Sequence, residues 1–393
     1  MSNLRATVRR MATITVFVAT LVPILAGGAS AKSSAAAPRV IRLAGLDALQ
    51  TSALKDLNAW TTWLADNQVQ GYVGEIGWPS DDPRWGMLAK RFYNHANASG
   101  VAASTWVTGE WAGMMPLANY KWIANGTFET LASAAIMEQN PGTAANPNGV
   151  NVTGPEMGAP AAEATSTFSN TNVGSIVTSY HYDAPTTFTH LAARGVRLVR
   201  IPFRWERIQR APYAPLDVEE LARMKALVQS AAAAGLRVVL DMHNYGAYYL
   251  SDGTQGVRRA IGSAQLPAKA FADVWTKLAV AFAGDTSVHA FDLMNEPMGM
   301  PAPRNLRPAT TWESASQLAL NAIRATGDRR QVMVSGYNWS GMRGWSTTHP
   351  TTWITDSAKN FRYEAHQYWD AHSTGRYGTY DVELAVAKAR PQS

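Results

Sequence analysis

Short runs of apolar and β-branched residues recur along the chain, and each follows a glycine at the end of a helix-like stretch. Clear copies of this unit follow Gly71, Gly100, Gly195 and Gly235, and weaker copies follow Gly284 and Gly327. Glycine suits the left-handed conformation that commonly ends a helix. Short, continuously apolar runs are typical of buried parallel strands. The pattern therefore predicts helices and strands that alternate around a parallel sheet.

Eight runs of this kind predict strands. They lie at 72–76, 101–107, 149–154, 197–202, 236–242, 288–295, 331–336 and 361–367. Eight parallel strands with right-handed crossovers are what a closed (β/α)8, or TIM, barrel requires. An open doubly wound sheet is the alternative, but no Gly-rich phosphate loop follows the first run. We therefore expect one α/β barrel domain over residues 40–393.

One predicted helix, between Asp217 and Gly235, can be described in detail. Asp217 is placed to cap it, and Glu220 lies three residues later, as in a capping box. Apolar positions then recur with a helical period from Leu221 to Val228. Gly235 is expected to end this helix.

Residues 1–31 have the pattern of a secretory signal. Arg5, Arg9 and Arg10 precede an apolar stretch over 14–25, and small residues at 29–31 suit a cleavage site. The apolar stretch is short for a membrane span, although a retained anchor is the alternative. We predict removal of 1–31, a spacer over 32–39, and a secreted protein without a membrane partner after that removal.

Composition narrows the class of ligand. The chain of 393 residues has a formal charge of +6, and loss of the three signal arginines leaves about +3. With no Lys/Arg run, nucleic-acid binding is not expected. Charged residues are only 16%, whereas Trp occurs 14 times, which suits uncharged, ring-shaped ligands as well as a core. The absence of Cys excludes disulfides and thiolate chemistry.

Polar side chains gather where the predicted strands end, which is the catalytic face of a barrel. They are Glu75, Trp106, Glu110, Arg200, Arg204, Trp205, Glu206, Asp241, His243, Asn244, Asn295, Glu296, His366, Tyr368 and Asp370. Glycosidic cleavage needs two carboxyl groups that flank the bond. Glu75 and Glu296 each end a short apolar strand, and Asn295 beside Glu296 can hold a sugar hydroxyl. His243 and His366 lack metal-ligand spacing, so no catalytic metal is expected.

Five runs carry a resemblance to a known family. They are Val199-Arg-Ile-Pro-Phe-Arg-Trp, Leu240-Asp-Met-His-Asn-Tyr, Leu293-Met-Asn-Glu-Pro, Tyr363-Glu-Ala-His-Gln-Tyr-Trp-Asp and Gly74-Glu-Ile-Gly-Trp-Pro. Together they resemble glycoside hydrolase family 5, whose members are retaining (β/α)8 enzymes. The resemblance implies Glu296 as general acid/base and Glu75 as nucleophile. It also implies substrate-binding roles for Asn295, Arg200, His243, His366, Tyr368 and Trp106.

The same resemblance implies a secreted endo-β-1,4-glucanase that cleaves β-glucan in two steps without a cofactor, and we expect a monomer. A β-mannanase is the near alternative, because one axial hydroxyl separates the sugars. An inactive carbohydrate-binding barrel and a folded but inactive gene product are the remaining alternatives.

The order of these runs differs from the family. The strands of Glu75 and Trp106, which resemble family strands seven and eight, come first in this chain. The sequence therefore predicts a circularly permuted barrel with strand order 7-8-1-2-3-4-5-6. The joint is expected near 113–148, where Pro, Asn and Gly form turns at 140–149.

Overall fold

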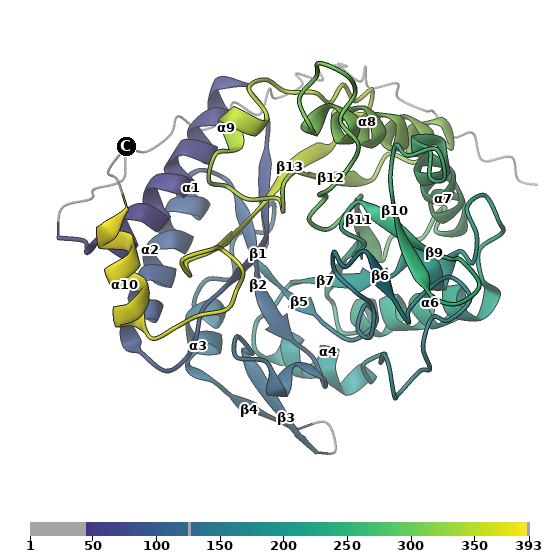
Figure 1. Cartoon of the computed structure of the whole chain (residues 1–393). Coiled ribbons are helices and arrows are strands. Elements are labelled where there is room, and N and C mark those ends of the chain that lie inside the picture. Colours follow the sequence, from purple (N-terminus) through teal and green to yellow (C-terminus); the bar gives the residue numbers. More distant parts are fainter. Residues whose placement is uncertain (1–44, 125–126, 391–393) are drawn as a thin grey trace, which may run out of the picture. The chain divides into compact units, whose positions relative to one another are not determined.

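The computed structural model describes residues 45–124 and 127–390. Eight parallel strands close into a barrel in the order β1-β13-β12-β11-β8-β7-β5-β2 (Figure 1). They are β1 (Gly71–Gly77), β2 (Ala102–Thr108), β5 (Gly149–Val152), β7 (Leu198–Phe203), β8 (Arg237–Met242), β11 (Val288–Asp292), β12 (Gln331–Ser335) and β13 (Phe361–Tyr368). Each predicted strand is present, and β13 pairs with β1 to close the ring. The prediction of a single-domain TIM barrel is confirmed.

Helices surround this barrel (Figure 1). The longer ones are α1 (Ala48–Asp66), α2 (Pro83–Ala98), α3 (Ala132–Glu138), α4 (Pro185–Ala193), α6 (Val218–Ala233), α7 (Ala268–Ala281), α8 (Ala309–Ala325) and α10 (Tyr380–Ala389). Short turns of helix are η1 (Ala112–Met114), α5 (Trp205–Ile208) and α9 (Trp345–Thr348). Trp85, Trp275 and Trp312 are fully buried. Several tryptophans therefore belong to the core, and the Trp count alone was a weak sign of sugar binding.

Most of the glycines that were expected to end helices have the left-handed conformation of that position. Gly100, Gly195 and Gly235 have φ values of 71°, 85° and 82° after α2, α4 and α6, as expected of helix-ending glycines. Gly71 differs, because it is already the first residue of β1, and Gln68 takes the left-handed position with φ 56°. A Cβ at Gly71 would lie 2.3 Å from Leu64 Cδ1. This glycine therefore lets α1 pack closely on β1.

Helix α6 begins where the sequence predicts. The Oδ1 of Asp217 accepts a hydrogen bond of 2.9 Å from the Glu220 amide, so the cap is formed. The Glu220 carboxylate does not complete a capping box, because it accepts hydrogen bonds from Tyr180 and Tyr182 and pairs with Arg223. Glu220 therefore fastens the loop before α4 onto α6.

Two small sheets lie outside the barrel. Strands β3 (Tyr120–Ala124) and β4 (Thr127–Thr130) form an antiparallel pair, and β6 (Thr165–Ser166), β10 (Gly256–Ala260) and β9 (Ala247–Ser251) form another sheet. The predicted joint over 113–148 thus contains β3, β4 and α3, and not only turns. Hairpins of this kind have shorter and more polar strands than the barrel, so the apolar-run criterion passed over them.

The predicted signal 1–31, the spacer 32–39 and residues 40–44 of the predicted domain lie outside the described residues. Within the described ranges, no helix combines the length and apolar character that a membrane crossing requires.

Candidate active site

The carboxyl ends of the barrel strands bring all eight predicted site residues into one connected group. Glu75 is in β1, Trp106 in β2, Arg200 in β7, and both His366 and Tyr368 in β13, while His243 follows β8 and the Asn295-Glu296 pair follows β11. Residues from four strands and from the ends of two others meet because parallel strands of a barrel present their carboxyl ends at the same face.

The two glutamates lie against the same imidazole. His366 Nδ1 is 2.9 Å from Glu296 Oε1 and 3.5 Å from Glu75 Oε2. One carboxylate oxygen of each glutamate and one nitrogen of His366 all fall within 4.8 Å of one another. Carboxyl groups near 5–5.5 Å apart are typical of retaining glycosidases, whereas inverting enzymes place them roughly 6.5–9.5 Å apart. The observed approach favours the retaining arrangement.

The environments of the two glutamates shift their pKa values in opposite directions. Burial alone would raise the pKa of Glu75, but the charges of His366 and Arg200 and the Tyr368 hydroxyl outweigh it, so the net shift is downward. Burial raises the pKa of Glu296, and His366 only partly opposes it. The two shifts favour the ionised form of Glu75 and the protonated form of Glu296, which is the division that nucleophile and acid roles require.

Hydrogen bonds fix both oxygens of Glu75. Arg200 Nη1 donates to Oε1 at 3.0 Å, and the Tyr368 hydroxyl donates to Oε2 at 2.7 Å. Burial and the neighbouring carboxylates raise the pKa of Tyr368 well above its usual range, so this hydroxyl keeps its proton. The Glu75 carboxylate is therefore held in one orientation by two donors.

A second chain of contacts leads from Glu296 to Trp106. Asn295 Oδ1 accepts from Arg200 Nη2 at 3.0 Å, and Asn295 Nδ2 lies 3.2 Å from His243 Nε2. His243 Nδ1 lies 2.7 Å from Asp241 Oδ2, which places the ring proton on Nδ1. The rings of His243 and Trp106 stack with centroids 5.9 Å apart. Trp106 is thereby part of the same site.

The backbone at Glu296 is strained. Its φ of 44° lies in the left-handed region, which residues with a Cβ seldom adopt. Asn295 N still donates to Met242 O at 2.8 Å, so the segment stays attached to β8 after β11 has ended at Asp292. Strain of this kind persists where the surroundings enforce it, and it is concentrated at functional sites.

Arg200 is the centre of positive charge in this site. Its guanidinium is fully buried and contacts Glu75, Asp241, Asp292 and Glu364 at 2.7–3.3 Å. Arg200 and His366 oppose the effect of burial and lower the pKa of Glu364 to about 2. Burial and the Glu364 charge instead raise the pKa of Asp292 well above its usual range. This shift favours the protonated form of Asp292, which reduces the negative charge around Arg200.

His366 acts in this cluster as a cation. Burial would lower its pKa, but Glu75, Glu296 and Glu364 raise it well above its usual value. Its two ring nitrogens face Glu296 Oε1 and Glu364 Oε1, at 2.9 and 3.2 Å. Glu75, Glu296 and His366 have the donor types of a metal site, but the raised pKa of His366 favours its protonated form, in which neither ring nitrogen offers a lone pair to a metal.

Comparison with known proteins agrees with this geometry. The family described as Cellulase (glycosyl hydrolase family 5) matches residues 153–390, which is more than half of the chain. The chain belongs to glycosyl hydrolase family 5. The matched range includes Glu296 and His366, but Glu75 and Trp106 precede it.

Individual family 5 relatives are endoglucanases. Endoglucanase gh5-1 of Neurospora crassa is 30% identical over 201 residues, which is 50% of this chain and 46% of that protein. Endoglucanase 3 of Humicola insolens is 31% identical over 203 residues, which is 50% of this chain and 46% of that protein. The chain thus spans about half the length of these relatives. The solved Pseudomonas stutzeri endoglucanase Cel5A, in complex with cellobiose, is 33% identical. The match covers 62% of this chain and 68% of that chain, with a TM-score of 0.51.

The structure adds two residues to this group that no sequence motif pointed to. Asn151 in β5 accepts from Arg200 Nη1 at 3.0 Å and donates to Gly74 O at 2.9 Å. Glu364 bonds His366 and accepts from the Ser335 hydroxyl at 2.7 Å. A signal for Glu364 was present, because residues 364, 366 and 368 alternate along one face of β13.

Not every polar residue at a strand end joins the site. Glu206 is fully buried and accepts from the Tyr249 amide and the Asn244 side chain. Asp370 accepts from the amides of Thr374 and Gly375 and so fixes a turn. Glu110 faces His181 at 2.7 Å in a separate cluster. None of these three acids contacts the group around Glu75 and Glu296.

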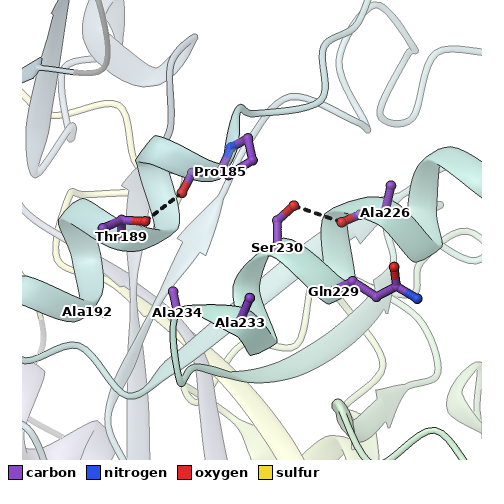
Figure 2. A pocket seen from close by; sticks show the side chains of 8 residues that line it. All are labelled: Pro185, Thr189, Ala192, Ala226, Gln229, Ser230, Ala233 and Ala234. Atoms are coloured by element: carbon purple, nitrogen blue, oxygen red, sulfur yellow. Dashed lines mark hydrogen bonds between the residues drawn. The ribbon is translucent and has the colours of Figure 1, made fainter.

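A hollow of about 580 Å³ lies elsewhere, between α4 and α6 on the outer helical layer. Figure 2 shows Thr189 and Ser230 bonded to the backbone of their own helices, at Pro185 and Ala226. Half of its lining residues are alanine, and none is an acid or a base. It therefore lacks the groups for glycosidic chemistry.

Proposed function

We propose that this chain is a retaining endo-β-1,4-glucanase that hydrolyses internal bonds of β-glucan. The observation that carries the proposal is the pair Glu75 and Glu296, whose oxygens approach within 4.8 Å and whose pKa values shift in opposite directions. Relatives named as endoglucanases, one of them solved with cellobiose, support a glucan substrate.

In the first step, Glu75 attacks the anomeric carbon while Glu296 gives its proton to the leaving glycosidic oxygen. A bond forms between that carbon and a Glu75 oxygen, and the glycosidic bond breaks. Because His366 donates to Glu296 Oε1, Oε2 is the oxygen left to carry the proton. In the second step, Glu296 takes a proton from water, whose oxygen attacks the same carbon and releases Glu75.

The neighbouring side chains position these groups and the sugar. Arg200 and Tyr368 orient Glu75, and His366 separates the two acids. Asn295 and His243 are placed to bind hydroxyls of the cleaved sugar, and Trp106 provides an aromatic face for the ring. None of these steps requires a cofactor.

Trp339 extends the proposed substrate surface. Asn338, Trp339 and Ser340 all have left-handed φ values, of 69°, 62° and 53°, in the turn after β12. This turn leaves Trp339 38% exposed, with its ring 5.8 Å from that of Tyr245. Tyr245 in turn contacts His243 Nε2 at 3.1 Å. An exposed ring connected to the site in this way suits a neighbouring glucose unit.

The deciding experiment is proton NMR of the hydrolysis of a soluble cello-oligosaccharide. Retention gives the β-anomer as the first product, and mutarotation follows. An α-anomer as first product contradicts the mechanism. Equal or greater activity on β-mannan than on carboxymethyl-cellulose contradicts the substrate and indicates a mannanase.

We further propose that the barrel is circularly permuted, with strand order 7-8-1-2-3-4-5-6 and its joint within 113–148. Two observations support this: the family match starts at residue 153, just after β5, and the strands of Glu75 and Trp106 precede it. Helices α10 and α1 lie in contact, with the Tyr380 hydroxyl 2.7 Å from Asp47 Oδ2. A rearranged chain, with 149–390 linked to 45–148, is expected to fold and cleave glucan as the native order does. Misfolding of that chain alone would contradict the proposal.

We also propose that residues 1–31 direct secretion and that the secreted protein is a monomer. The Arg-rich start, the apolar stretch and the small residues at 29–31 support export. Sequencing of the protein from culture medium is expected to give an amino terminus at Lys32, and size-exclusion chromatography with light scattering a single-chain mass. An intact Met1 on extracted membranes would indicate a retained anchor.

A further inference from the structure

A second group of acids and a histidine lies beside the proposed active site but shares no residue with it. We propose that Glu110, His181 and Asp183 bind a divalent cation of the Zn²⁺ or Mn²⁺ type. Glu110 directly follows the β2 region, and the other two precede α4. One ligand atom from each of the three falls within 4.8 Å of the others. We call this set the second cluster.

In each carboxylate of the second cluster, one oxygen accepts a backbone hydrogen bond and the other oxygen faces His181. Glu110 Oε1 accepts the Ala184 amide at 3.0 Å, which leaves Oε2 facing His181 Nε2 at 2.7 Å. Asp183 Oδ2 accepts the Glu110 amide at 3.1 Å, which leaves Oδ1 3.8 Å from His181 Nε2. Backbone amides thus orient both acids before any ligand arrives, as outer-shell partners do in metal sites.

The Asp183 side chain provides the independent sign of a missing ligand. It is only 1% exposed, and its Oδ1 has no hydrogen-bond partner. A buried, unpaired carboxylate oxygen is costly, because it has lost its water without gaining a donor. A cation between Oδ1, Glu110 Oε2 and His181 Nε2 would replace that lost interaction.

Charge in the second cluster is also uncompensated. Among the described residues, no Lys or Arg forms an ion pair with Glu110, Asp183 or the nearby Glu156. Two carboxylates and an imidazole with no counter-ion are what a divalent cation neutralises.

The donor set indicates the class of cation. Oxygen and imidazole ligands together suit Zn²⁺ and Mn²⁺, whereas Ca²⁺ takes six to eight oxygens. Ligands about 2.0–2.2 Å from Zn²⁺ lie roughly 3.0–3.6 Å from each other, so Glu110 would withdraw slightly and Asp183 approach. The Trp111 ring stacks on the His181 ring, with centroids 5.4 Å apart and an interplanar angle of 9°. This stacking fixes the orientation of the imidazole. The remaining coordination positions would be filled by water.

The test uses the full secreted chain without a polyhistidine tag, stripped with EDTA and dialysed. Titration calorimetry with ZnCl₂ and MnCl₂ is expected to show one saturable site for at least one of the two ions. At 100 times Kd that ion should raise Tm by roughly 3–4 °C for a chain of this size. CaCl₂ should bind more weakly.

Variants locate the site. Asp183→Asn and His181→Gln should each weaken binding by at least about 100-fold, since even outer-shell changes cost 10- to 100-fold. Glu163→Gln, which changes an exposed carboxylate outside the second cluster, should bind like the wild type. Glu296→Gln should also bind like the wild type, which separates the second cluster from the catalytic pair.

Two results would overturn the proposal. The first is the absence of saturable binding of Zn²⁺ and Mn²⁺ at millimolar concentration to folded wild type. The second is binding that Asp183→Asn and His181→Gln leave intact. If one of these variants fails to fold, the other still decides the location. None of these readouts depends on glucanase activity.

Discussion

Two groups of acids, each with one histidine, lie at the carboxyl ends of neighbouring barrel strands, and they differ in how their charge is balanced. Glu75, Glu296 and His366 are accompanied by the buried cation Arg200, and the neighbouring carboxylates raise the pKa of His366, which favours its cationic form. Glu110, His181 and Asp183 have no such cation among the described residues. Residue types alone are therefore a poor guide to chemistry. The counter-charge decides whether carboxylates exchange protons with a substrate or hold an ion.

The largest expected effect is on the chemistry of the first group. Glu75→Gln should lower kcat on carboxymethyl-cellulose on the order of 10⁴-fold or more, because no nucleophile remains. Glu296→Gln should lower it about 10²–10⁴-fold, the usual contribution of an acid/base group. Glu110→Gln, the matched change in the second cluster, should retain activity. Equal losses in all three variants would erase the distinction between the groups.

Arg200 should be the largest single contributor to stability among the ion pairs. Arg200→Met leaves buried carboxylates without their cation, so the free energy of unfolding should fall by about 3–5 kcal/mol. Arg210→Ala removes a cation that pairs with Asp217 at 3.0 Å and is 39% exposed, so its cost should be about 0–1 kcal/mol. Urea unfolding followed by tryptophan fluorescence measures both. Similar midpoints for the two variants would contradict the role given to Arg200.

Glu364 should tune the pH dependence of the first group through His366. Removing this negative charge lowers the pKa of the protons held nearby, so Glu364→Gln should move the alkaline limb of kcat/KM to lower pH by about 1 unit. Ser335→Ala keeps the charge and removes one hydrogen bond, so its shift should be smaller. An unshifted limb in Glu364→Gln would show a structural role only.

The same carboxylate bears on acid stability. Its folded pKa is depressed from 4.5 to about 2, so its stabilising effect is present above pH 4.5 and is lost as pH falls from there towards 2. Glu364→Gln should therefore unfold with a shallower dependence on pH in that window. Circular dichroism across the acid range measures the slope.

The smallest effects come from a matched pair of tryptophans, each stacked on the histidine of its own region. Trp106→Ala should lower kcat/KM by roughly 5- to 30-fold, as expected for about 1–2 kcal/mol of lost stacking. Trp111→Ala should leave kcat/KM close to wild type but reduce the rise in Tm that the cation produces. The reverse pattern would mean that the second cluster belongs to the substrate site.

Most of the barrel could be predicted from the sequence because its strands are buried on both sides and are therefore continuously apolar. All eight runs form strands within a few residues of the expected bounds. The run at 288–295 is the clearest overestimate, since β11 ends at Asp292. Leu293 and Met294 are apolar enough to continue it, but the strand has already ended, and Glu296 takes a left-handed conformation.

Prediction of the site succeeded where residues lie in motifs and failed where only folding brings them together. Seven of the eight expected residues are parts of runs that resemble the family, Trp106 lies outside those runs, and all eight form one connected group. Glu110 and His181 are 71 positions apart and belong to no motif. Their proximity depends on how β2 and the segment before α4 meet, which no local pattern specifies.

Gly74 and Glu364 are distant in the sequence but compete for the same space, and mutational scanning should reveal this dependence. A Cβ at Gly74 would lie 1.6 Å from Glu364 Oε1. The Glu364 carboxylate therefore occupies the space that a side chain at position 74 would need. Alanine at 74 is therefore expected to be harmful beside glutamate and less harmful beside serine at 364, where His366 Nε2, at 2.8 Å from the new Cβ, would still have to move. The two positions should change together or not at all, although 290 residues of chain separate them.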